Sequence, residues 1–175
     1  TSRRSSARSI GSSARRASSA RRLRYNPARM ILSDRDIRAE LESGRIVIDP
    51  FTNESSWILG TATRIMRQFA GASIRVNFIV TANAADAQNF LGPLAKEFLV
   101  FTDPDRVVVK QLGLSELPAF VFIRMDGTVP KVAVGWNARD WHDVADSIAK
   151  TVSWKMPLIP ESSDPAPFRG SPALA

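Results

Sequence analysis

The centre of the chain alternates between short apolar runs and turn residues. Residues 98–101 are apolar, and a helical spacing of apolar side chains then continues as far as Gly113. Residues 120–123 are apolar throughout, which is typical of a strand buried on both faces. An Asp-Gly turn at 126–127 and an apolar return over 129–134 predict a hairpin. The pattern therefore predicts strand, helix, strand, turn and strand.

The helix of this unit has capping residues at its start. Asp103 is a good N-cap, because its side chain can accept hydrogen bonds from the first backbone N–H groups. Pro104 fits the first helical position, where no N–H donor is needed. Asp103 and Asp105 also allow an interpretation as a cation site, but an isolated Asp-Pro-Asp sequence is typical of a helix cap.

The same kind of pattern predicts elements on either side. Strands are expected at residues 45–48 and 74–81, which are rich in β-branched side chains. Helical periodicity is clear in residues 53–70 and 137–152, and residues 84–98 are helical with a break at a Gly-Pro pair. Counted from residue 46, the order is strand, helix, strand, helix, strand, helix, strand, strand, helix.

This order resembles the thioredoxin-like superfamily, in particular its peroxiredoxin and TlpA-type branch, over residues 54–152. The shared motifs are Asp-Pro-Asp, a Leu-Pro pair at Leu117 and Pro118, and the Asp-Gly turn. The resemblance implies an α/β fold, a central mixed sheet flanked by helices, for a domain covering residues 52–153. It also implies that Pro118 is cis and faces the loop that carries the active site in this superfamily.

The corresponding loop here is residues 51–57, and it contains no cysteine. Ser55 and Ser56 stand where active relatives carry cysteines, and a hydroxyl group cannot carry out disulfide exchange. The resemblance therefore implies the fold without its redox reaction. Extended peptides pair with the backbone beside the cis-proline in active relatives, which predicts a groove for a protein or peptide partner. Its predicted residues are Ser55, Ser56, Trp57, Leu117 and Pro118.

Composition narrows the chemistry further. The 175 residues include no cysteine, which excludes disulfides and thiolate metal sites, and the single His142 excludes a multi-histidine site. No cofactor and no metal are expected. A serine nucleophile would need a base, and His142 is the only histidine in the chain. Its place on the last helix favours a structural role. We therefore predict no catalytic residue. A binding function is expected in preference to an enzymatic one.

Residues 30–51 carry a second resemblance. Ser33 predicts a helix N-cap, Gly44 predicts the end of that helix, and a strand follows. This segment resembles the amino-terminal segment of dCTP deaminases, which are trimeric, β-rich enzymes of the dUTPase-like fold. A nucleotide enzyme related to them is thus an alternative function. Nothing after Thr52 matches the family's catalytic Ser, Arg and Glu motifs.

Residues 1–29 hold nine arginines and no lysine or acidic residue, whereas the remaining residues hold 15 basic and 17 acidic side chains. Such a segment is typical of disorder. It allows three interpretations: an organelle leader, a nucleic-acid-binding arm, or an arm without function if translation begins at Met30. The body is otherwise expected to be cytoplasmic. The arginines expected to contact nucleic acid are Arg3, Arg4, Arg15, Arg16, Arg21 and Arg22.

The C-terminal tail, residues 154–175, is rich in proline and shows little periodicity. It is expected to be extended and to lie along the body through Leu158, Ile159 and Phe168. The four tryptophans of the chain can be interpreted as part of a binding face, since tryptophan is frequent at binding hot spots. Packing of the last helix is the simpler interpretation for most of them.

Overall fold

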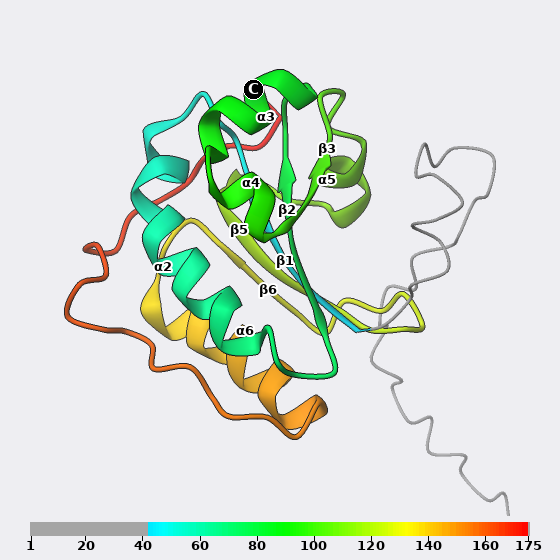
Figure 1. Ribbon diagram of the computed structural model, residues 1–175, viewed down its shortest axis with the longest axis vertical. Helices are drawn as coiled ribbons and strands as arrows, with labels where there is room; N and C mark the ends of the chain where they lie inside the picture. The colour runs from blue at the N-terminus through cyan, green and yellow to red at the C-terminus, as the bar shows by residue number, and fades with distance from the viewer. Residues whose placement is uncertain (1–41, 175) are drawn as a thin grey trace, which may run out of the picture.

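The computed structural model describes residues 42–174, which form a mixed five-stranded sheet with helices packed on both faces (Figure 1). This architecture is the predicted α/β fold. The elements, in chain order, are β1 (Ser43–Ile48), α2 (Asn53–Phe69), β2 (Arg75–Val80), α3 (Ala84–Leu91), α4 (Leu94–Glu97), β3 (Leu99–Thr102), α5 (Val107–Leu112), β4 (Glu116–Leu117), β5 (Ala119–Ile123), β6 (Lys131–Val134), α6 (Ala138–Thr151) and β7 (Ser171–Pro172).

The sheet has the strand order β3-β2-β1-β5-β6, with β1 at its centre. β1 pairs in parallel with β2 and antiparallel with β5, and Ile46 lies opposite Phe78 on one side and Phe120 on the other. β3 extends the parallel half, whereas β6 extends the antiparallel half through the hairpin. The central position suits β1 because Ile46, Val47 and Ile48 are all inaccessible to solvent.

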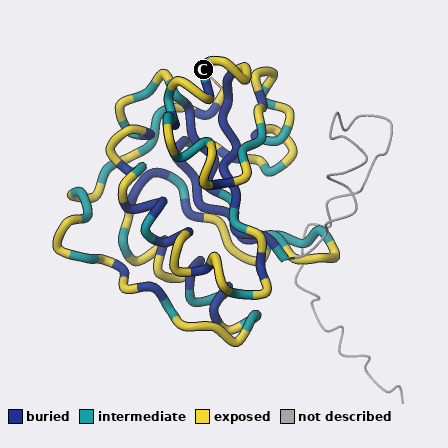
Figure 2. Tube along the Cα trace, in the orientation of Figure 1, coloured by how far each residue is buried: buried dark blue, intermediate teal, exposed yellow. Residues whose placement is uncertain are grey.

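Alternate residues of the central strand enter two separate apolar clusters. Ile46 and Ile48 belong to the larger cluster, which lies under α2 and α6. Val47 belongs to the smaller cluster on the opposite face, together with Val109 of α5. Figure 2 shows the buried strands running through the middle of the molecule. Burial on both faces explains why the predicted strands read as continuous apolar runs.

The predicted long helices are confirmed. α6 begins after Asn137, whose side-chain oxygen accepts a hydrogen bond from the Arg139 N–H at 2.9 Å. Its apolar stripe, which includes Trp141 and Ile148, is buried against the sheet. The predicted break between α3 and α4 falls at Gly92, where φ is +53°. None of the helices within residues 42–174 has the length and apolar character that a membrane span requires.

The start of α5 differs from the prediction. Asp103 caps the helix as expected, and its carboxylate accepts hydrogen bonds from three backbone N–H groups, including that of Val107 at 2.6 Å. Pro104 is not the first helical residue, however. A turn intervenes, in which the Arg106 N–H donates to the Asp103 carbonyl and Arg106 adopts a left-handed φ of +54°. The helix therefore begins at Val107.

The predicted helix end at Gly44 is wrong. Gly44 lies inside β1, which begins two residues earlier than predicted, and it pairs with Val76 and Phe122. It fits there because a side chain would press on Ile148: a Cβ atom would lie 3.2 Å from the Ile148 Cδ1 atom. The helix predicted before Gly44 lies outside the described residues.

The tail is extended and packed along the body, as Figure 1 shows in orange and red outside α2 and α6. Ile159 is buried and Phe168 is partly buried, but Leu158 is 68% exposed, which corrects the expectation for that residue. Polar contacts also hold the tail against α2. Arg64 of α2 donates to both carboxylate oxygens of Asp164 at 2.9 and 2.8 Å.

Candidate functional site

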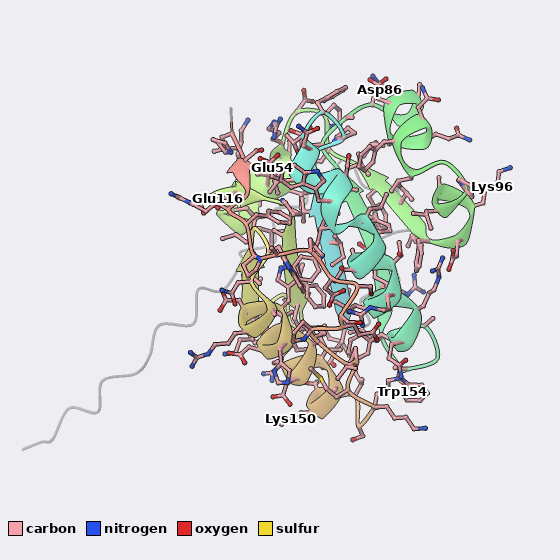
Figure 3. All side chains as sticks on the ribbon, turned by 90° about the vertical axis from the view of Figure 1, so that its left-hand side faces the viewer. Glu54, Asp86, Lys96, Glu116, Lys150 and Trp154 are labelled. Atoms are coloured by element: carbon pink, nitrogen blue, oxygen red, sulfur yellow. The ribbon has the colours of Figure 1, made fainter. Side chains whose placement is uncertain are left out.

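The candidate site surrounds Pro118, which joins β4 to β5. The Leu117–Pro118 peptide bond is cis. Both residues are buried, and the Pro118 carbonyl accepts a hydrogen bond from the Gly135 N–H at 2.8 Å. Glu116, which precedes them, lies at the same end of the molecule as Glu54 of α2 and far from Trp154 (Figure 3). The fold thus places the cis-proline and the first turn of α2 at one end.

Ser55 of the predicted groove is not open to a ligand. It is fully buried, and its Oγ atom accepts a hydrogen bond from the Asp49 N–H at 3.0 Å. The Thr52 Oγ1 atom lies 3.1 Å from the same oxygen. Ser55 therefore fixes the connection between β1 and α2. Its helical phase with Ile58 and Ala62, both buried, is the sequence signal that places it on the inner face.

Replacing Ser55 with alanine is expected to lower the free energy of unfolding by about 2 kcal/mol, because the buried Asp49 N–H loses its acceptor. Ser56 is exposed, so the same replacement there should leave stability unchanged. Urea unfolding of both variants measures the difference. Equal stability of the two variants would show that the Ser55 hydrogen bond contributes nothing.

The surface beside the cis-proline is covered by the chain's own tail. β7 pairs antiparallel with β4, with Ser171 opposite Leu117. The Ala173 N–H donates to the Ser115 carbonyl at 2.9 Å, which continues the pairing by one step. Neither β4 nor β7 was predicted from the sequence. We call residues 168–173 the docked segment.

Two glycines make this contact close. A Cβ atom on Gly170 would lie 2.5 Å from the Leu117 carbonyl oxygen, which is far inside van der Waals distance. A Cβ atom on Gly135 would lie 2.8 Å from both the Gly170 nitrogen and the Phe168 carbonyl oxygen. Gly135 also has a φ of +61°, a left-handed conformation that favours glycine. The docked segment and the cis-proline region therefore meet backbone to backbone.

The docked segment begins at an aromatic contact. Phe168 and Trp136 exchange two backbone hydrogen bonds, each of 2.9 Å. The Phe168 ring packs edge-on against Trp57, with the ring centroids 5.5 Å apart. Trp57 remains 56% exposed. The structure thus brings Trp57, Leu117 and Pro118 of the predicted groove together around the tail, and it leaves Ser55 inside the protein.

The other end of the docked segment is held by Arg106. Its Nη1 atom donates to the Ala173 carbonyl and its Nη2 atom donates to the Asp49 carboxylate, both at 2.7 Å. The Ala173 methyl group is buried in the smaller apolar cluster beside Leu117. Arg106 therefore links the loop after β1 to the tail. No pattern in the sequence marks Arg106 for this role.

Glu116 forms a second ion pair at the site, with Arg169 of the docked segment. Its carboxylate accepts hydrogen bonds from the Arg169 guanidinium at 2.9 Å and from the Gly170 N–H at 3.0 Å. The hydrogen bond from Arg169 is the main reason why the pKa of Glu116 lies below its ordinary value.

A second carboxylate, Asp164, anchors the tail further from Pro118. Burial tends to raise the pKa of Asp164, but hydrogen bonds from the Glu161 N–H, Arg64 and Thr61 outweigh this effect and lower that pKa.

Acid is expected to loosen the tail before the sheet. Because the pKa values of Glu116 and Asp164 are depressed in the folded protein, their stabilisation is complete above the ordinary carboxyl range, about pH 4. It is lost as the pH falls through the lower, folded values. The protection of the Ala173 amide, taken relative to the intrinsic exchange rate at each pH, should therefore fall on acidification below about pH 4 more than protection within β1 falls. An equal fall in protection at both places would contradict this prediction.

The described residues around the site offer no metal cluster of His, Cys, Asp or Glu side chains. His142 lies on α6, half exposed, with its Nδ1 atom 3.7 Å from the Asp143 carboxylate. Shallow surface depressions occur between β6 and α6 and between α2 and β3, both away from Pro118. Around Pro118, the described residues meet through backbone pairing of β4 with β7 and through the Gly135–Pro118 hydrogen bond.

The remaining predicted segments add little to this site. The arginines of residues 1–29 and most of the deaminase-like segment lie outside the described residues. The part of that segment that is described, residues 42–51, supplies β1 and the turn after it. β1 is the central strand of a mixed sheet flanked by helices. No contact of the described residues favours a deaminase site.

Comparison with solved structures identifies the architecture. A protein named as thiol:disulfide interchange protein DsbE from Chlorobium tepidum matches with a TM-score of 0.57 and 17% identity, covering 67% of this chain and 84% of that chain. A protein named as a thioredoxin from Neisseria meningitidis matches with a TM-score of 0.53 and 15% identity, covering 63% and 74%. The exposed lipoprotein thioredoxin Etrx1 from Streptococcus pneumoniae matches with a TM-score of 0.50 and 18% identity, covering 65% and 84%.

No protein-family model matches the sequence, and no curated protein matches it significantly. The structural matches are therefore a likeness of fold. The matches agree with the thioredoxin-like fold that the sequence resemblance implies, and this chain contains no cysteine. The chain has a thioredoxin-like fold, similar to that of thiol:disulfide oxidoreductases.

Proposed function

We propose that the chain is a redox-inactive, thioredoxin-like binding module that holds an extended protein segment beside cis-Pro118. One observation carries the proposal: an extended segment, β7, already pairs with β4 at the residue before Pro118. The edge of β4 therefore has the geometry for strand addition, in which backbone hydrogen bonds provide affinity and side-chain pockets provide selectivity.

The absence of thiols supports binding over catalysis. Disulfide exchange needs a thiolate, and none of the 175 residues can supply one. The loop after β1 uses its polar side chains for structure instead, since Asp49 and Ser55 both hydrogen-bond within it. The chain keeps the peptide-pairing half of the thioredoxin-like site and lacks the reacting half.

The test selects ligands from a random peptide library on the full chain and maps each ligand by amide chemical shifts. Selected peptides are expected to shift the signals of residues 115–118 and of Gly135. Lys150 on α6, at the opposite end of the molecule, serves as the matched reference position (Figure 3). Peptides that shift only the α6 region would overturn the proposal, and so would the lack of any selected peptide on both the unchanged chain and Gly170→Val, in which the tail cannot fit beside Leu117.

A further inference from the structure

The docked segment contacts the site through different chemistry at each position. Phe168 packs against Trp57, and Arg169 pairs with Glu116. Gly170 occupies a place without room for a Cβ atom. The two residues of β7 pair through their backbones, and Ala173 fills a buried apolar position. From residue 168 to residue 173, the docked segment therefore presents an aromatic residue, a basic residue, glycine, a small residue, proline and a small residue.

This sequence of contacts makes the site selective. A larger residue in place of Gly170 would collide with the Leu117 carbonyl oxygen, and an acidic residue in place of Arg169 would face the Glu116 carboxylate. Each is a repulsive feature that rejects unsuitable segments, which specificity requires in addition to attraction. A strand edge that only offered backbone pairing would not discriminate in this way.

The tail is fixed in two separate zones. The first zone uses Asp164, which Arg64 and Thr61 hold against α2, and the Pro165 carbonyl, which accepts from the Trp136 indole N–H at 2.7 Å. The second zone is the docked segment. Ala166, between them, is exposed, and the Arg169 side chain is 90% exposed. The two zones make separate contacts, so release of the second zone would leave the contacts of the first in place.

We propose that the docked segment is a resident ligand of the cis-Pro118 surface. The partner of this surface is a protein segment with the same order of chemistry, aromatic–basic–glycine–small–proline–small, which displaces the docked segment. This inference rests on the proposed function and specifies its ligand. A tethered ligand acts at an effective concentration of about 1 mM or more, so the intact tail should weaken apparent binding of any competing segment.

The test uses a fluorescent peptide with the sequence of residues 166–175 and three full-length proteins. These are the unchanged chain, Gly170→Val, whose docked segment cannot fit, and Ala166→Val, which adds the same side chain at an exposed position of the tail. We expect Gly170→Val to bind the peptide at least tenfold more tightly than the other two. The peptide carrying Gly170→Val should not bind, and the peptide carrying Arg169→Glu should bind several-fold more weakly.

A second variant keeps the proposal testable if Gly170→Val does not fold. Arg169→Glu in the full chain changes an exposed side chain only and should also strengthen peptide binding, because it weakens the docked segment. If tail-released variants bind library peptides but not the tail peptide, this inference fails and the proposed function stands. If amide exchange shows Ala173 released and no peptide binds, both fail. Dimers formed by exchange of tails would show that the tail of a second copy occupies the cis-Pro118 surface. That result would overturn the proposal of a different protein as partner.

Discussion

Replacing Gly135 with alanine is expected to lower the free energy of unfolding by about 3 kcal/mol, as measured by urea denaturation. Two causes act together. Alanine is strained at a φ of +61°, and its Cβ atom would meet the Gly170 nitrogen and the Phe168 carbonyl oxygen at 2.8 Å. The docked segment should move away, and the amides of Trp136 and Phe168 should lose protection from exchange.

Gly127 provides the matched control. Its φ is +74°, but no atom of the described part of the chain lies within 4 Å of the place that a Cβ atom would take. Gly127→Ala should therefore cost only the backbone strain, about 1–2 kcal/mol. The difference between the two variants isolates contact with the tail. Equal losses would show that the docked segment contributes nothing to stability.

Replacing Asp103 with alanine is expected to cost about 3 kcal/mol, because three backbone N–H groups at the start of α5 lose a charged acceptor. Asp103 is buried, so water cannot replace the carboxylate fully. Thermal or urea unfolding measures the loss. Asp103→Asn, which keeps one accepting oxygen, should recover part of it.

Asp105 is the control for this prediction. It belongs to the same Asp-Pro-Asp motif but is exposed, and within residues 42–174 its side chain makes no hydrogen bond, whereas its backbone carbonyl accepts one from Lys110. Asp105→Ala should change stability by less than about 0.5 kcal/mol. A similar loss at both positions would mean that net charge at the helix start matters more than the cap.

Local patterns predicted most of the sheet and its helices, because the spacing of apolar residues within a segment reflects which of its side chains are buried. The apolar run 120–123 and the stripe of α6 needed no information from elsewhere in the chain. The start of α5 was misplaced because the left-handed turn at Arg106 leaves no mark on periodicity. Gly44 was misread because glycine is equally typical of a helix end and of a closely packed strand.

The covering of the candidate site could not be predicted in the same way. Ser171 and Pro172 have little intrinsic preference for a strand, and they pair with β4 only because the rest of the tail brings them there. The contacts of the docked segment join residues more than 30 positions apart, and Arg169 and Glu116 are 53 positions apart. The sequence indicated a groove, and the tertiary structure supplies its occupant.

The position of β7 in the chain has a consequence for synthesis. Every strand of the five-stranded sheet, together with α6, has been made once Thr151 is added, whereas Ser171 follows 20 residues later. At about 5–20 residues per second, translation of that interval takes about 1–4 s. During this time the nascent chain has β4 and Pro118 but not yet the segment that covers them. The edge of β4 is thus always synthesised before the segment that covers it.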